Sequence, residues 1–384
     1  MIKRPVWAEI DLQALGDNVR EIRRVTDANA EIMAVVKANA YGHGVLPVSR
    51  AALRNGAAWI GVALLQEALL LREAGIKAPI LILGYTPAQD VAEVVKNEIS
   101  QTIFTWDDAL AVASAAQRLG RKAKVHVKID TGMGRLGFNS DRKTVDMICR
   151  LAQLPGLELE GIYTHFASAD EADKTFAQEQ FAKFQQLLQQ LAARHIDIRW
   201  RHCANSAAIL DLPSTHLDMV RPGIIIYGLY PSPHVRHDRV KLTTVLSLKA
   251  RVAFVKDVPA GSSISYGRTF YTREQTRIAT IPLGYGDGYG RLLSNRAEVL
   301  IGGRRAPVAG RVCMDQLMAD VGHIQDVRQG DEVVLLGSQG RETITAEELA
   351  GYLGTINYEV LCMISERVPR VYLNGEAKQT DARR

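Results

Sequence analysis

The sequence predicts an α/β fold in two parts, a (β/α)8 TIM-like barrel followed by a mainly-β domain. Its 384 residues suffice for two domains at roughly 150 residues each. The first part alternates short apolar runs with longer amphipathic segments, and after residue 240 the pattern becomes strand-like with Gly-bearing turns. These observations place a barrel domain in residues 1–240 and a β-rich domain in residues 241–384.

Eight apolar runs rich in Val, Ile and Leu predict strands that are buried on both faces. A first helix is expected near residues 11–24. Segments between the runs, such as 107–119 and 175–195, have the three- and four-residue apolar spacing of amphipathic helices. Eight such units in about 240 residues are typical of a barrel, and a doubly wound open sheet is the alternative. The runs lie near 32–37, 58–62, 79–83, 101–104, 123–130, 157–165, 198–204 and 217–222.

Residues 230–239 combine prolines, histidines and charges without periodicity, which predicts a linker. Beyond the linker, only residues 345–353 are predicted to form a helix, with Thr345 as its N-cap and Glu347 and Glu348 in its first turn. The predicted strands of this part are 241–255, 276–282, 297–301, 308–321 and 331–336.

Charge and hydropathy argue against nucleic acid and membranes as partners, and the cysteine spacing argues against a disulfide framework. The net charge is +5 without a dense basic run, so neither nucleic acid nor an acidic membrane is expected to bind. No apolar stretch approaches the ~20 residues of a membrane span, and the N-terminus lacks a signal-peptide pattern, so we expect a cytoplasmic protein. The cysteines have no CxxC spacing, which predicts reduced, mostly buried thiols and no metal site. They are Cys149, Cys203, Cys313 and Cys362.

Active sites of barrels lie at the carboxyl ends of the strands, where this sequence places several polar residues. Lys37 ends the first run; it either extends to solvent or forms a Schiff base with an aldehyde. Ser206 either caps a helix or, with Gly223, belongs to a phosphate cradle. Other strand ends contribute Lys128, Arg135, Thr164, His165, Asn205 and Arg221.

Eight ordered motifs closely resemble those of alanine racemase, a pyridoxal-phosphate enzyme of fold type III. The resemblance covers nearly the whole chain. It implies interconversion of L- and D-alanine, pyridoxal 5'-phosphate as cofactor, and supply of D-alanine for peptidoglycan synthesis. The motifs are AVVKANAYGHG, KIDTGMGRLGF, HCANSA, DMVRPGIIIYG, SISYGRTF, IPLGYGDGY, GRVCMDQ and TINYEV.

The resemblance assigns a role in cofactor binding to residues of both predicted domains. Lys37 would hold the cofactor as a Schiff base, and Arg221 would face its pyridine nitrogen. Because guanidinium keeps its proton, that nitrogen would stay unprotonated and the cofactor would be a weaker electron sink. The other implied contacts are Tyr41, His165, Asn205, Ser206, Gly223, Ile224 and Tyr358.

The resemblance also implies two bases, because racemisation needs a proton carrier on each face of Cα. Lys37 would take the proton from D-alanine and Tyr266 from L-alanine. An ordinary tyrosine has a pKa near 10, so His165 and Arg221 are expected to tune Tyr266. The charge of Arg221 would disfavour the imidazolium form of His165, although a lone barrel histidine is also explained by packing.

Substrate binding is assigned by the same resemblance. Arg135 and the backbone amide of Met314 would bind the carboxylate, and Lys128 matches a position that is carbamylated in many relatives. Tyr285 and Tyr358 would form the entry gate. Arg291 and Arg311 either match an outer corridor or are ordinary surface charges.

Because Tyr266 and Met314 lie in the β-rich part and Lys37 in the barrel, the resemblance implies a homodimer with sites shared between chains.

Four other functions are alternatives to alanine racemisation. They are a fold type III decarboxylase, a racemase for serine or several amino acids, a small pyridoxal-phosphate carrier, and a barrel of unrelated chemistry. The RPG and SYG motifs argue against the decarboxylase, and the residues after the linker argue against the small carrier.

Overall fold

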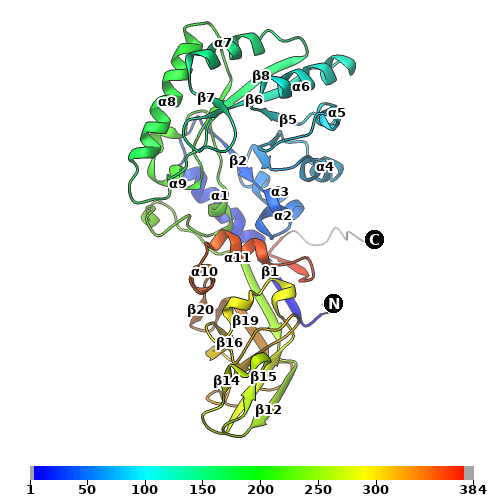
Figure 1. Cartoon of the computed structure of the whole chain (residues 1–384), viewed down its shortest axis with the longest axis vertical. Helices are drawn as coiled ribbons and strands as arrows, with labels where there is room; N and C mark the ends of the chain where they lie inside the picture. The colour runs from blue at the N-terminus through cyan, green and yellow to red at the C-terminus, as the bar shows by residue number, and fades with distance from the viewer. Residues whose placement is uncertain (1–3, 376–384) are drawn as a thin grey trace. The chain divides into compact units, whose positions relative to one another are not determined.

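The structure, a computed structural model, describes residues 4–375 and divides into two compact units, which we describe separately (Figure 1). The barrel unit comprises Leu15–Ala40 and Val45–Thr243. The β-rich unit comprises, within the described residues, the segment up to Ala14, the short segment Tyr41–Gly44, and the chain from Thr244 onward.

Eight parallel strands form a closed barrel. Each strand pairs with the next along the chain, and the last pairs with the first, which closes the ring. This closure confirms the predicted fold class and excludes the open sheet. The strands are β2 (Glu31–Val35), β3 (Trp59–Val62), β4 (Ile80–Ile82), β5 (Ser100–Ile103), β6 (Ala123–Asp130), β8 (Leu157–Tyr163), β9 (Trp200–His202) and β10 (Met219–Val220), with β7 (Phe138–Asn139) beside β6.

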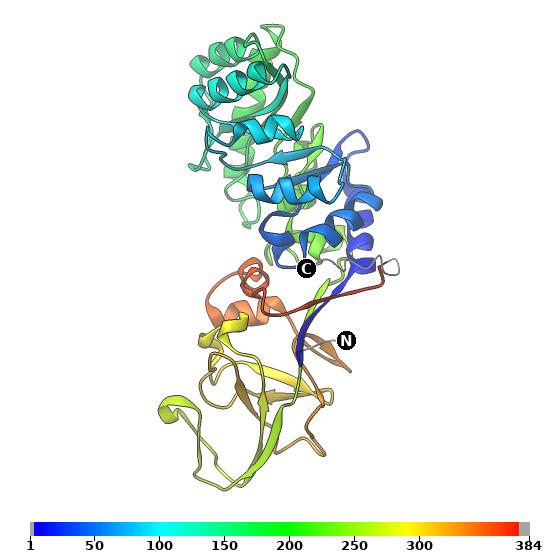
Figure 2. The ribbon, with the colours of Figure 1, turned by 90° about the vertical axis from the view of Figure 1, so that its right-hand side faces the viewer.

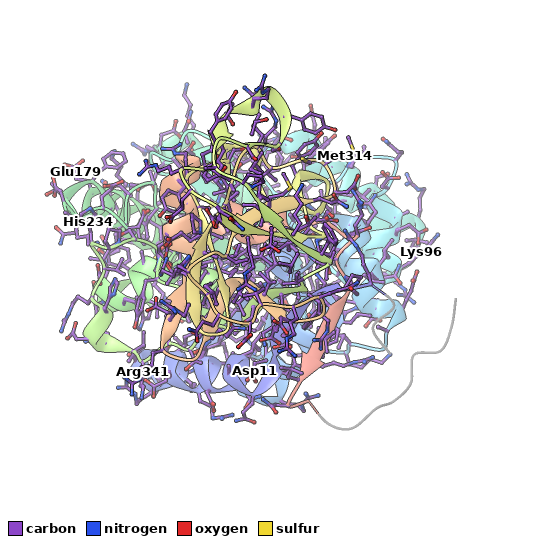
Figure 3. All side chains as sticks on the ribbon, turned by 90° about the horizontal axis from the view of Figure 1, so that it is seen from below. Asp11, Lys96, Glu179, His234, Met314 and Arg341 are labelled. Atoms are coloured by element: carbon purple, nitrogen blue, oxygen red, sulfur yellow. The ribbon has the colours of Figure 1, made fainter. Side chains whose placement is uncertain are left out.

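Amphipathic helices line the outside of the barrel (Figures 1 and 2). Their apolar faces cover the strands, and their charged residues face outward, as Lys96 and Glu179 do in Figure 3. The helices are α1 (Leu12–Val25), α3 (Val45–Arg54), α4 (Leu65–Glu73), α5 (Val91–Lys96), α6 (Trp106–Arg118), α7 (Arg142–Leu151), α8 (Thr175–Ala192) and α9 (Ser206–Asp211). The short turn α2 (Lys37–Tyr41) follows the first barrel strand.

The barrel interior has an apolar and a polar part. Met33, Trp59, Leu81 and Met219, from four successive strands of the ring, pack into one buried cluster. The ring of Trp59 on β3 lies 5.6 Å from that of His126 on β6. Because β3 and β6 are not neighbours in the sheet, this contact crosses the interior. Polar side chains therefore fill part of the barrel's centre.

The β-rich unit contains a seven-stranded sheet, a three-stranded sheet and a short hairpin. The large sheet has the order β17-β16-β19-β11-β1-β21, with β20 paired to β19. Its strands are β1 (Val6–Asp11), β11 (Leu246–Arg251), β16 (Glu298–Ile301), β17 (Arg304–Pro307), β19 (Glu332–Gln339), β20 (Glu342–Ile344) and β21 (Arg370–Leu373). The small sheet has β12 (Phe254–Val258), β15 (Thr276–Ile281) and β18 (Leu317–Asp320), and the hairpin has β13 (Ser263–Ile264) and β14 (Phe270–Tyr271).

The N-terminal strand belongs to the large sheet of the β-rich unit and not to the barrel. β1 pairs antiparallel with β11 and parallel with β21, so it belongs to the sheet of the β-rich unit although it begins the predicted domain 1–240. Val6 and Trp7 are both buried, and from Ala8 to Asp11 buried and half-buried residues alternate, which suits a sheet with one covered face. Alternation identifies a strand but does not identify its partner.

Three expectations for the β-rich part were wrong in detail. The predicted strand 241–255 is two strands, β11 and β12. The predicted strand 308–321 contains only β18, because Gly310 turns the chain at a positive φ and residues 313–316 form a loop. A second helix, α11 (Asn357–Met363), follows α10 (Ala346–Leu353). α11 escaped prediction because its N-cap, Ile356, makes no side-chain hydrogen bond.

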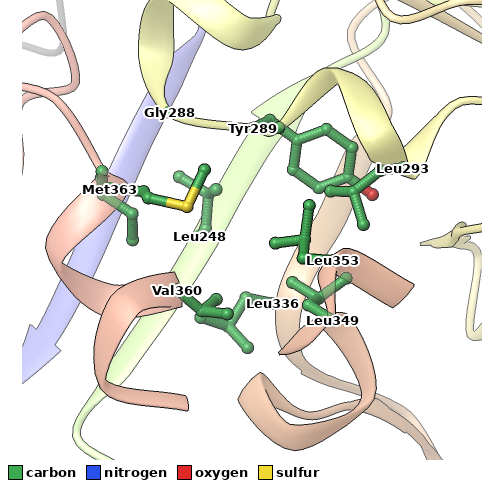
Figure 4. Close-up of a pocket in the computed structure, with 11 residues that line it drawn as sticks. Leu248, Gly288, Tyr289, Leu293, Leu336, Leu349, Leu353, Val360 and Met363 are labelled. Atoms are coloured by element: carbon green, nitrogen blue, oxygen red, sulfur yellow. The ribbon is translucent and has the colours of Figure 1, made fainter. Parts of the chain in front are cut away.

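A small cavity of about 10 Å³ lies among α10, α11, β11 and β19 of the β-rich unit (Figure 4). Leucine side chains and the ring of Tyr289 form most of its wall. The hydroxyl of Tyr289 is buried and finds no hydrogen-bond partner in the part of the chain that the structure describes.

The cysteines are less buried than predicted. Cys203 is buried, Cys149 and Cys313 are half-buried, and Cys362 is exposed. Among residues 4–375, no helix is both long and apolar enough to cross a bilayer.

Candidate active site

The carboxyl end of the barrel gathers a cluster of basic side chains. Lys37 follows β2, Lys128 lies near the end of β6, Arg135 follows it, and Arg221 follows β10. Lys128 and Arg221 are buried, and Lys37, Arg135 and Arg221 all act electrostatically on Lys128. The charges of Lys37, Arg135 and Arg221 in one place favour an anionic ligand, such as a phosphate or a carboxylate.

Lys37 is held at the start of an unusual turn. Ala38, Asn39, Ala40 and Tyr41 all have φ between 51° and 54°, a left-handed conformation that costs about 1–2 kcal/mol per non-glycine residue. Side chains of the barrel unit support it: Glu67 accepts from the Ala38 amide, and Asn39 Oδ1 accepts from the Val45 amide at 2.8 Å. Strain of this kind persists where the fold fixes a functional side chain.

Arg221 is fixed by four acceptors. Its Nη1 donates to His202 Nδ1 at 2.8 Å, and its Nη2 lies within 3.2 Å of His165 Nδ1 and of the carbonyl oxygens of Thr164 and Cys203. Because arginine only donates, both Nδ1 atoms must accept. Burial, and then the charge of Arg221, hold the pKa of His165 and of His202 well below the usual range. Both histidines are therefore neutral.

Lys128 is a buried amine in a cationic neighbourhood. Burial, and then the charges of Arg221, Arg135 and Lys37, lower its pKa to about 6. Its Nζ lies 4.4 Å from the centre of the Tyr163 ring. At neutral pH this amine is mostly uncharged and is available as a nucleophile.

The residues that follow β9 and β10 form a small polar cradle. Asn205 caps α9 by accepting from the Ala208 amide, so the interpretation of Ser206 as the N-cap was wrong. Ser206 is the first residue of the helix, and its Oγ accepts from the Gly223 amide at 2.9 Å. Ile224 follows, fully buried, at the start of the 3-10 turn Ile224–Tyr227. This arrangement places a hydroxyl, whose own proton is still available to a ligand, next to the backbone amides that follow Arg221.

These residues fit pyridoxal 5'-phosphate. The cradle and the cations suit its phosphate, and Lys37 offers an amine to its aldehyde. The Nη atoms of Arg221 bond to the protein, whereas its Nε donates to none of the described residues. That N–H suits a ring nitrogen that accepts a hydrogen bond.

The remaining candidates lie in the β-rich unit, and three of them are exposed. Tyr266 is 69% exposed, Met314, labelled in Figure 3, is 53% exposed, and Tyr285 is 40% exposed. Tyr266 begins the 3-10 turn Tyr266–Arg268 directly after Ser265, which has a φ of 66°. Large apolar surfaces left exposed next to a strained turn are typical of an interaction site.

Hydrogen bonds hold the segments of these three residues together. Ser265 Oγ donates to the Arg311 carbonyl at 2.6 Å and lies 3.6 Å from Cys313 Sγ. The Tyr285 amide donates to the Cys313 carbonyl at 3.0 Å. Gly284 has no room for a side chain, since a Cβ would lie 2.2 Å from that carbonyl oxygen. The β-rich unit thus presents Tyr266, Tyr285 and Met314 on one connected set of loops.

The candidates are divided between the two units. Tyr41 and Tyr358 both fall in the β-rich unit, with ring centres 6.1 Å apart. Arg291 is exposed and Arg311 is half-buried, so the outer-corridor interpretation stays open. The meeting of Tyr41, Tyr266, Tyr285, Met314 and Tyr358 with the barrel residues stays a prediction.

Two further residues, which were not predicted from the sequence, shape this end of the barrel. His202, the last residue of β9, is a direct partner of Arg221. Gln180 is fully buried; its Nε2 donates to the His165 carbonyl at 3.2 Å and its Oε1 accepts from the Ala167 amide at 2.9 Å. A signal existed for Gln180, because it occupies an apolar position of the amphipathic segment 175–195.

Both parts of the chain match families of known proteins. Residues 10–231 match the profile described as alanine racemase, N-terminal domain, and residues 245–372 match the alanine racemase, C-terminal domain. The alanine racemase of Methanococcus maripaludis is 51% identical over 374 residues, which are 97% of this chain and 100% of the relative.

Solved structures agree with this match. The alanine racemase of Clostridium difficile 630 superposes with a TM-score of 0.94 at 43% identity and covers 97% of both chains. The histidine racemase of Leuconostoc mesenteroides subsp. sake has a TM-score of 0.89 at 29% identity, covering 97% of this chain and 99% of that one.

Proposed function

Since the chain belongs to the alanine racemase family, we propose that it interconverts L-alanine and D-alanine with pyridoxal 5'-phosphate as its cofactor. Family membership makes the chain a racemase and hence an isomerase. The observation that carries the cofactor proposal is the polar end of the barrel, where Lys37, Arg221 and the Ser206 cradle lie with Arg135 and the buried amine of Lys128.

The residues proposed to hold the cofactor come from both units. Lys37 would bind it covalently, Arg221 would face its ring nitrogen, and His165 would support Arg221. Tyr41, Asn205, Ser206, Gly223, Ile224 and Tyr358 would surround its phosphate. Bound pyridoxal phosphate supplies an electron sink that stabilises the charge left when an amino acid loses its Cα proton.

Lys37 and Tyr266 are proposed as the two bases. Lys37 Nζ would carry the proton on the face from which D-alanine loses it, and the Tyr266 hydroxyl on the face from which L-alanine loses it. Because His165 Nδ1 accepts from Arg221, the proton of neutral His165 lies on Nε2, from which it would be donated to the oxygen of Tyr266. The half-buried Lys37 and the exposed Tyr266 are both accessible to a substrate.

Arg135 and the Met314 amide are proposed to bind the substrate carboxylate. Asp130 supports the turn that carries Arg135, because its Oδ1 accepts from the amides of Gly132 and Gly134. Lys128 is proposed to be carbamylated: its neutral amine would add to carbon dioxide and release one proton. The resulting anion would offset the charges of Arg135 and Arg221.

Alanine is proposed over larger amino acids because Tyr285 and Tyr358 would narrow the entry. The identity to the alanine racemases also exceeds the 29% identity to the histidine racemase. A homodimer is proposed because the exposed Tyr266 and Met314 need a barrel to face. A cytoplasmic enzyme supplying D-alanine for peptidoglycan is the expected setting.

Replacing Lys37 tests the proposal. We expect the purified protein to racemise L-alanine when pyridoxal phosphate is supplied and to carry the visible absorbance of bound cofactor. Lys37→Ala should lose both the absorbance and the turnover, measured by chiral chromatography of alanine. Lys96→Ala, a change on the exposed face of α5, is the matched control and should keep both. Retained absorbance in Lys37→Ala would contradict the covalent role.

A further inference from the structure

A chain of buried polar side chains crosses the barrel interior from Arg221 toward the amino ends of the strands. Arg221 Nη1 lies 2.8 Å from His202 Nδ1, and His202 Nε2 lies 2.9 Å from His126 Nδ1. His126 Nε2 then lies 3.2 Å from Glu160 Oε2. Both histidines are fully buried and Glu160 nearly so. The proposed function uses Arg221 but assigns nothing to His126 or Glu160.

Each hydrogen bond in this chain has one possible direction. Arg221 can only donate, so His202 Nδ1 accepts and the proton of neutral His202 lies on Nε2. That proton points to His126 Nδ1, which must therefore accept, and the proton of His126 lies on Nε2. Glu160 completes the chain as the acceptor. Because the carboxylate of Glu160 only accepts, it excludes the opposite arrangement, in which the proton of each histidine would lie on Nδ1.

The barrel backbone is built around this chain. Gly161 pairs with His126, and a Cβ at Gly161 would lie 2.3 Å from His126 Nδ1, so only glycine leaves room for the ring. The register between β6 and β8 shifts at His126, as in a β-bulge. Trp59 lies edge-on to His126, and Tyr163 stacks on His202 with ring centres 4.7 Å apart. These rings keep water from the histidines.

Glu160 is stabilised as an anion at the outer end. It accepts from Ser100 Oγ at 2.6 Å and from Lys124 Nζ at 2.9 Å. Burial alone would raise its pKa, but the hydrogen bonds from His126, Ser100 and Lys124 lower the pKa to about 2. Ser100, Lys124 and Glu160 also line an open cavity of about 520 Å³, so the chain ends at solvent.

We propose that Glu160 and His126 are positioning residues that fix the proton of His202 and thereby hold the guanidinium of Arg221 in one orientation. The proposal rests on the proposed function, in which Arg221 faces the cofactor ring. Without a carboxylate at position 160, His126 can place its proton on Nδ1. His202 Nε2 must then accept a hydrogen bond from His126 Nδ1, so the proton of His202 moves to its own Nδ1. There it faces the N–H of Arg221, and two donors cannot form a hydrogen bond with each other. Arg221 would lose its shortest hydrogen bond.

Glu160→Gln is the main test because the side chain keeps its size while its amide can also donate. Lys124 favours the amide oxygen, which leaves the NH2 group facing His126 Nε2. We expect ¹⁵N NMR of the histidine-labelled full-length protein to show both rings with the proton on Nε2. In Glu160→Gln, a second form with the proton on Nδ1 should appear. Glu158→Gln, the same change at an exposed site of β8, should leave the spectrum unchanged.

A second readout is the dissociation constant of pyridoxal 5'-phosphate. Glu160→Gln and His126→Phe should each weaken binding by about tenfold, the scale of a lost hydrogen bond to a charged group. Because Glu160 and His126 act through the same series of hydrogen bonds, the double variant should bind pyridoxal 5'-phosphate no more weakly than His126→Phe alone. Circular dichroism of each variant separates weaker cofactor binding from misfolding. If His126→Phe does not fold, Glu160→Gln alone decides the proposal.

An unchanged histidine spectrum and unchanged cofactor affinity in Glu160→Gln would overturn the proposal, as would additive losses in the double variant. Failure of the wild-type protein to bind pyridoxal phosphate would instead contradict the proposed function. The NMR experiment needs no cofactor, so it still decides whether Glu160 sets the protons of His126 and His202.

Discussion

Buried polar atoms in this protein are mostly paired, and Tyr289 is an exception. Its hydroxyl lies in the apolar cavity wall of the β-rich unit without a partner among the described residues, whereas the equally buried Tyr227 donates to the Val35 carbonyl at 3.0 Å. A buried donor without a partner destabilises the folded state by about 1–3 kcal/mol. Removing the two hydroxyls should therefore have opposite effects.

We expect Tyr289→Phe to leave the free energy of unfolding unchanged or to raise it by about 1 kcal/mol, because it removes an unpaired hydroxyl. Tyr227→Phe, the matched control, should lower it by about 1 kcal/mol, because the Val35 carbonyl loses its donor. Urea unfolding followed by circular dichroism measures both. A loss in Tyr289→Phe as large as in Tyr227→Phe would show that its hydroxyl is paired in solution.

Single residues of the candidate site were predictable to different extents. Lys37, Lys128, His165 and Arg221 lie at or near the carboxyl ends of apolar runs, and the rule that barrel sites lie at strand ends selects them. Their roles came from the resemblance. His126 and Glu160 sit inside strands, and only the register, with its bulge at His126, determines that they face one another. No periodicity in the sequence encodes that register.

At the scale of elements, α10 and α11 of the β-rich unit show that a helix with a capping residue can be predicted from local sequence and that a helix without one cannot. The N-cap Thr345 accepts from the Glu348 amide at 3.1 Å, as the sequence predicted, and α10 begins directly after it. α11 lacks such a cap and was not predicted. The eight barrel strands were found for a similar reason, since doubly buried strands are continuous apolar runs. The place of β1 depends on distant partners and could not be found locally.

Thr345→Ala should lower the free energy of unfolding by ~1 kcal/mol, because the Glu348 amide loses its acceptor at the helix start. Thr345→Ser keeps a hydroxyl and should retain most of the stability. Chemical denaturation of the three proteins under one set of conditions makes the comparison. Equal stability of the alanine and serine variants would mean that the cap contributes nothing to α10.

At the scale of the whole molecule, the candidate residues are divided between two units of one chain. The barrel holds Lys37, Lys128, Arg135 and Arg221, and the β-rich unit holds Tyr266 with its neighbours. Neither unit alone contains both proposed bases. The central claim is that each active site combines the barrel of one chain with the β-rich unit of another.

Mixing two inactive variants tests this claim most directly. Lys37→Ala and Tyr266→Phe should each be nearly inactive as homodimers. After co-refolding in equal amounts, half of the dimers should be mixed, and each mixed dimer should have one intact site of its two. We expect alanine racemisation at about one quarter of the wild-type rate. Recovery of no activity, in a sample where mass spectrometry confirms mixed dimers, would contradict a site shared between chains.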